Sequence, residues 1–105
     1  MAKTYSIPEL DDKLLTRIAN FGYKLERKSR DCIKLMPIDE INLQYKRYYV
    51  FHIDFTSGEI DGMNMSEHVP GYKRATIWVK PQELELMLDV RKALQKLLSI
   101  GELLP

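Results

Sequence analysis

The chain has 105 residues, which is enough for one domain. Apolar residues make up 45% and charged residues 30%, so the composition excludes a disordered tail, a collagen-like repeat and a disulfide-rich miniprotein. Sixteen Lys and Arg against 15 Asp and Glu leave a net charge of +1, which indicates no particular class of partner. We therefore expect a single globular domain over residues 1–105.

The cellular compartment is indicated by the cysteine count and by hydropathy. The single cysteine, Cys32, has no partner for an internal disulfide, and this favours a reducing environment. The first residues lack the apolar core of a signal peptide. No apolar run approaches the ~20 residues that a membrane-spanning helix requires. We expect a cytoplasmic protein with no membrane partner.

The N-terminal segment predicts a helix over residues 7–21. Ser6 and Glu9 have the spacing of a capping box, in which each side chain accepts from a backbone N–H at the start of the helix. Gly22 follows where a left-handed residue would end it. The apolar positions in between recur at spacings of three and four residues, namely Ile7, Leu10, Leu14, Ile18 and Phe21.

A second helix is predicted at the C-terminus, from Pro81 as its first residue to a stop at Gly101. Glu83 and Glu85 place negative charge near the positive end of its dipole. One apolar stripe comprises Met87, Val90, Leu94 and Leu97; a second comprises Leu86, Ala93 and Ile100, with Leu84, Leu88 and Leu98 at the flanks. Because this arc is broader than one sheet face would cover, either the first helix or a second subunit packs on it. We expect a homodimer or partner contact at Leu86, Val90, Ala93, Leu97 and Ile100.

The intervening residues predict β-structure. Alternating or β-favouring runs lie at residues 23–27, 32–36, 48–55, 59–65 and 75–79, and the run at 59–65 is the weakest. Short polar turns at 28–31 and 56–58 join successive runs, which indicates antiparallel pairing. The prediction is an α+β fold in the order α-β-β-β-β-β-α, with an antiparallel sheet of four to five strands flanked by the N-terminal and C-terminal helices on one face.

The charge distribution is more informative than the total. Segments 23–34, 45–51 and 72–80 hold ten of the sixteen cations and only two acids, so they sum to +8 while the rest of the chain sums to −7. Seven of the ten aromatic residues lie in the same segments. Cations that follow phosphates and rings that stack on bases are what binding of a single strand requires. The predicted phosphate contacts are Lys24, Lys46, Arg47, Lys73, Arg74 and Lys80, and the predicted stacking residues are Tyr48, Tyr72 and Trp78.

Simpler interpretations of these residues remain open. Lysine and arginine on an exposed strand also keep a sheet soluble and protect its edges, and aromatic residues also build the core of a small domain. The alternative function is a protein-interaction or regulatory module. It would dock through the C-terminal helix or through the edge between Met63 and Met65, because methionine makes adaptable contacts.

Residues 70–83 carry a local resemblance. The stretch PGYKRATIWVKPQE has a Pro-Gly pair, basic residues, an alternating strand and a proline that opens a helix. It resembles the strand-to-helix junction of the positive cofactor four family of transcriptional coactivators, small dimers that bind single-stranded DNA on a curved antiparallel sheet. The resemblance covers residues 45–98 at most. It implies that Lys73, Arg74 and Lys80 face nucleic acid and that the last helix forms the dimer contact. Ala75 stands where the family usually has glycine, and the first helix has no counterpart in the family's core.

Catalytic and metal chemistry find little support in the sequence. Cys32, His52, Asp54 and His68 lack the close spacing of a structural zinc motif. Cys32 with His52 would supply a nucleophile and a base, but a lone cysteine beside an apolar residue is more typical of a buried filler. No phosphate-binding glycine loop or hydrolase motif is present. We therefore expect a non-catalytic protein with no cofactor and no metal.

Overall fold

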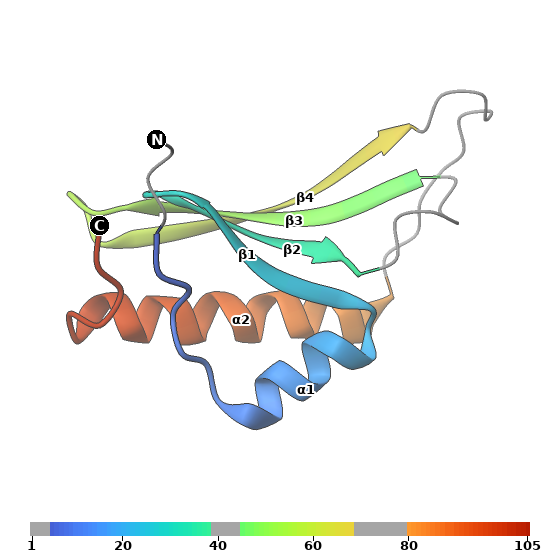
Figure 1. Ribbon diagram of the computed structural model, residues 1–105, viewed down its shortest axis with the longest axis horizontal. Coiled ribbons are helices and arrows are strands. Elements are labelled where there is room, and N and C mark those ends of the chain that lie inside the picture. The colour runs from blue at the N-terminus through green and yellow to red at the C-terminus, as the bar shows by residue number, and fades with distance from the viewer. Residues whose placement is uncertain (1–4, 39–44, 69–79) are drawn as a thin grey trace.

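The structure is a computed structural model that describes residues 5–38, 45–68 and 80–105; the side chains of residues 45–47 and 64–68 are outside this description. Two helices enclose four consecutive strands along the chain (Figure 1). The elements are α1 (Asp12–Asn20), β1 (Tyr23–Ser29), β2 (Cys32–Pro37), β3 (Tyr45–Asp54), β4 (Glu59–His68) and α2 (Pro81–Ser99).

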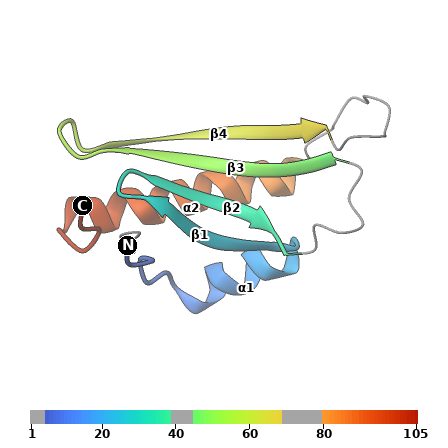
Figure 2. The ribbon, with the colours of Figure 1, turned by 45° about the horizontal axis from the view of Figure 1, so that its top comes forward.

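The four strands form one antiparallel sheet in the order β1-β2-β3-β4, and each strand pairs with its neighbour in sequence. Both helices lie on the same side of this sheet, with α2 running beneath it and α1 beside α2 (Figures 1 and 2). The predicted α+β class with an antiparallel sheet flanked by two helices is confirmed. The fifth strand, predicted at residues 75–79, lies outside the described residues.

The core lies between the sheet and α2. Alternate residues of the two central strands are buried toward the helices, because successive side chains of a strand point to opposite faces. They pack against one stripe of α2. The central part of this cluster comprises Ile33 and Leu35 from β2, Tyr49, Phe51 and Ile53 from β3, and Leu86, Val90 and Leu94 from α2.

Helix α1 begins later than predicted, at Asp12 instead of residue 7. Its N-cap is Asp11, whose side chain accepts a hydrogen bond from the Lys13 N–H at 2.7 Å. The predicted capping box at Ser6 is therefore wrong. Pro8 disfavours the helical conformation for the residue before it. The predicted end is confirmed, because Gly22 follows the helix with φ 82°.

Helix α2 begins at Pro81 as predicted, and it ends before Gly101, which has φ 78°. Its buried stripe combines residues from both predicted stripes: Val90 and Leu94 belong to the first and Leu86 to the second, and all three face the sheet. Leu84 and Leu88 are exposed instead.

A buried polar pair joins the sheet to the first turn of α2. The Tyr49 hydroxyl donates to a carboxylate oxygen of Glu83 at 3.0 Å. Glu83 is only 9% exposed, which is unusual for a glutamate. The ring of Tyr23 contacts that of Tyr49 edge-on, with 5.7 Å between the centroids. The pair therefore fixes the N-terminal end of α2 against β3.

Candidate functional site

The sheet has one face that no helix of the described residues covers (Figures 1 and 2). We call this the open face. Residues paired across antiparallel strands share a face, so the register places Glu26, Lys34, Val50 and Met63 in one row across all four strands. A second row holds Cys32, His52 and Asp61. The face also includes Lys24, Lys28, Met36, Tyr48, Asp54 and Glu59.

Three lysines gather on the side of the open face formed by β1 and β2. Lys24 and Lys28 flank Glu26, with ammonium-to-carboxylate distances of 3.3 Å and 2.5 Å. The hydrogen bond from Lys28 is the largest influence on this carboxyl, and it lowers the pKa of Glu26 below its usual value of 4.5. The Lys34 ammonium lies over the Tyr48 ring, 5.1 Å from its centroid. We call Lys24, Lys28 and Lys34 the lysine cluster.

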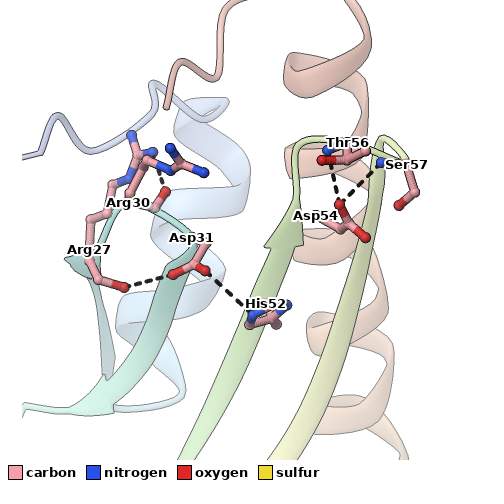
Figure 3. A network of polar contacts seen from close by, with 8 residues as sticks. Arg27, Arg30, Asp31, His52, Asp54, Thr56 and Ser57 are labelled. Carbon is pink, nitrogen blue, oxygen red and sulfur yellow. Dashed lines mark hydrogen bonds and ion pairs between the residues drawn. The ribbon is translucent and has the colours of Figure 1, made fainter.

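The opposite side of the open face is acidic. Asp54, Glu59 and Asp61 are exposed around the β3–β4 turn. Asp54 accepts hydrogen bonds from the backbone N–H groups of Thr56 and Ser57 at 2.9 and 3.1 Å (Figure 3). These bonds, led by the one from Ser57, lower the pKa of Asp54. The carboxylate therefore orders the hairpin turn, so Asp54 has a structural role in this acidic part of the face.

Cys32, His52 and Asp31 lie together at the end of the sheet. Cys32 is the cross-strand partner of His52, and the His52 Nε2 lies 3.6 Å from an Asp31 carboxylate oxygen (Figure 3). Burial raises the pKa of the Cys32 thiol, which disfavours the thiolate that nucleophilic attack or metal binding requires. In the described ranges no group of three or more His, Cys, Asp or Glu side chains is arranged to hold a metal ion.

Arg27 belongs to the basic segments of the sequence but not to the lysine cluster. It alternates with Glu26 and Lys28 and lies on the side of the helices, where its guanidinium donates to the backbone carbonyls of Ser6, Arg30 and Leu104. Figure 3 shows Arg27 and Arg30 side by side at the turn. Burial lowers the pKa of Arg27. This arginine therefore ties both ends of the described chain to the β1–β2 hairpin.

The predicted nucleic-acid residues are only partly placed by the structure. Lys24 is exposed on the open face, and Lys80 is exposed as the N-cap of α2. Tyr48 is 8% exposed, and with Lys34 above its ring it offers little surface to a base. Lys46 and Arg47 belong to β3, with side chains outside the description. Outside the described residues lie Tyr72, Lys73, Arg74 and Trp78.

Sequence reasoning did not select Lys28 and Lys34, which complete the lysine cluster. The signal that would have found them is strand alternation, since Lys24 and Lys28 are four residues apart on β1 and Lys34 is two residues beyond Cys32 on β2. Their convergence also depends on the register that pairs Glu26 with Lys34.

The predicted partner-contact residues of α2 divide into two groups. Leu86 and Val90 are buried in the core of the single chain, so they face the sheet and not a partner, and this part of the prediction needs correction. Ala93 and Leu97 are half-buried against the same core, and Ile100 is exposed.

Comparisons of the chain with protein-family models, with curated proteins and with solved structures found no match. In the part of the chain that the structure describes, neither helix has the length and hydrophobicity needed to cross a membrane.

Proposed function

We propose that the protein binds single-stranded nucleic acid along the lysine cluster of the open face. The observation that carries the proposal is the register, which brings lysines from two strands to a face that no described helix covers. The backbones of Lys24 and Lys28 are about 13 Å apart along β1, taking about 3.3 Å per residue, and both ammonium groups turn toward Glu26 between them. The cluster therefore gathers the charges of three lysines into one exposed patch, which a phosphate backbone could follow across the sheet.

Glu26 is the group that opposes this function. It neutralises one of the three lysine charges and holds the Lys24 and Lys28 ammonium groups at 3.3 Å and 2.5 Å. A phosphate approaching these lysines meets a carboxylate of the same sign. Removal of the Glu26 charge should therefore strengthen binding, a direction of change that partial unfolding would not produce.

Fluorescence anisotropy with a labelled single-stranded DNA oligonucleotide tests the proposal, with titrations at about 50 and 200 mM salt. Glu26→Gln should bind more tightly than wild type. Lys24→Glu/Lys34→Glu should bind more weakly and reduce the slope of log K against log salt by about 1.4, because each phosphate contact on a single strand contributes about 0.7. Lys13→Glu/Lys96→Glu is the matched control, because it reverses two exposed lysines on the helices.

Two results would refute the proposal. One is an absence of binding at the lower salt concentration by both the wild-type protein and Glu26→Gln. The other is equal weakening by the double variant and its helical control, since that would make net charge the cause and not the lysine cluster. Either result would favour the alternative, a protein partner. The side chain of Met63 is 61% exposed on the same face, and docking through apolar surface responds little to salt.

A further inference from the structure

Helix α2 has a second, largely exposed face turned away from Leu86, Val90 and Leu94, and Arg91 at its border lies near Gly62 of β4. Leu84 and Leu88 stand one turn apart and remain 43% and 47% exposed. Glu85, Arg91 and Lys92 are exposed beside them. With 3.6 residues per turn, these five residues occupy about 120° of the helix surface, centred on Leu88. We call them the Leu88 face.

The charges of the Leu88 face are separated along the helix. Glu85 lies one turn before Leu88, and Arg91 and Lys92 lie one turn after it. Among the described residues none of these three side chains has an ion-pair partner. The neighbouring Asp89 differs, because it pairs with Arg17 of α1 at 2.8 Å. The Leu88 face therefore combines apolar surface with charges that have no ion-pair partner among the described residues.

We propose that a second copy of this chain docks on the Leu88 face, with the two α2 helices antiparallel across a two-fold axis near Leu88. In this arrangement Leu88 meets Leu88 of the partner subunit, and Glu85 lies opposite Lys92 of the partner subunit, because Glu85 and Lys92 share one edge of the face. Leu84 packs on the aliphatic part of Arg91 of the partner subunit, since arginine covers apolar surface with its stem. The two-fold axis makes each of the last two contacts twice.

The order of the charges favours a second copy over an unrelated partner. The Leu88 face has an acid toward one end of the helix and bases toward the other. Two copies of such a face have complementary charges only when the two helices are antiparallel. A parallel pair would place Glu85 beside its own counterpart and the bases beside theirs, and like charges in such positions repel. This inference does not depend on the proposed function, because the open face lies on the other side of the sheet from α2 (Figure 1).

Sedimentation equilibrium over a concentration series tests the proposal with a charge swap. Glu85→Lys leaves only positive charge at positions 85 and 92, and Lys92→Glu leaves only negative charge at these two positions. Each variant alone should dimerise about tenfold more weakly than wild type or worse, because two ion pairs become two repulsions. An equimolar mixture should recover the dimer, because every Glu–Lys contact is then restored. Lys13→Glu on α1 should dimerise like wild type.

Three results would overturn the proposal. A wild-type chain that stays monomeric at every concentration would leave the Leu88 face to a partner of a different sequence. Single variants that dimerise as well as wild type would place the dimer contact elsewhere. Weak single variants whose mixture does not recover the dimer would exclude the antiparallel pairing, and circular dichroism of each variant would show that the monomers are folded.

Discussion

The buried contact between Tyr49 and Glu83 should be a major stabilising interaction of the fold. It joins β3 to the first turn of α2, at 3.0 Å between the hydroxyl and the carboxylate. A buried hydrogen bond to a charged group contributes about 1.5–3 kcal/mol. Tyr49→Phe removes the donor and keeps the ring packed, so the free energy of unfolding should fall by this amount. The melting temperature should fall by about 4 °C for each kcal/mol.

A double-mutant cycle isolates this interaction from other effects of each substitution. Glu83→Met removes the acceptor at similar volume, and it should be combined with Tyr49→Phe in a third variant. Urea denaturation followed by circular dichroism gives the four stabilities. The double variant should be more stable than the sum of the single effects predicts, by about 1.5–3 kcal/mol. Glu85→Gln is the control, since it changes an exposed carboxylate in the same turn of α2. Additive single effects would refute the reasoning.

Two further predictions concern the first helix and the lysine cluster. Asp11→Ala should lower the free energy of unfolding by about 1 kcal/mol through loss of the N-cap, whereas Ser6→Ala should change it little. Urea denaturation compares the two, and the reverse order would restore the capping box at Ser6. Glu26 has a folded-state pKa below its usual value of 4.5, so its stabilising effect is present above that value and is lost as the pH falls through the lowered pKa. Glu26→Gln should therefore be less stable than wild type near neutral pH, and the difference should disappear in acid; a difference that persists in acid would contradict this assignment.

The sequence predicts the sheet well because the alternation of apolar residues is both local and strong. Tyr49, Phe51 and Ile53 alternate along the third predicted strand, and all three are buried in the core. The turn after this strand is also encoded locally, because the Asp54 side chain accepts from two backbone N–H groups inside it. Such features depend on neighbouring residues alone, so they can be recognised without knowledge of the fold.

The start of α1 shows where local patterns mislead. Ser6 and Glu9 have the spacing of a capping box, and apolar residues follow at helical spacing, but the N-cap in the structure is Asp11. The segment before Asp11 is not helical, because it makes contacts with other parts of the fold. The Ser6 carbonyl accepts from Arg27, and Leu10 is buried in the core without being helical. A contact between residues distant in sequence decides the boundary.

The composition of the candidate site depends on register and could not be predicted from charge counts. A count of cations places Arg27 in one group with Lys24 and Lys28. In the structure Lys24 and Lys28 lie on the open face, whereas Arg27 lies on the face that the helices cover. The register adds Lys34 from β2 to the open face, and Arg27 is held on the other side by three backbone carbonyls. Glu26, one of the two acids in the basic segments of the sequence, lies at the centre of the cluster and partly neutralises it. The composition of the candidate site therefore depends on which face of the sheet each charged side chain occupies, and not on the number of cations in the sequence.

The layered architecture separates the two proposed surfaces. The lysine cluster lies on the open face, and the Leu88 face lies on α2, which packs against the other side of the sheet. Pairing through α2 would place both helix layers between the two sheets, so the two open faces would point away from each other. Dimerisation would then leave each lysine cluster accessible, and substitutions on one surface should not disturb the other. A single strand long enough to reach both clusters would gain from their linkage, whereas a short one would bind each cluster as it binds the monomer.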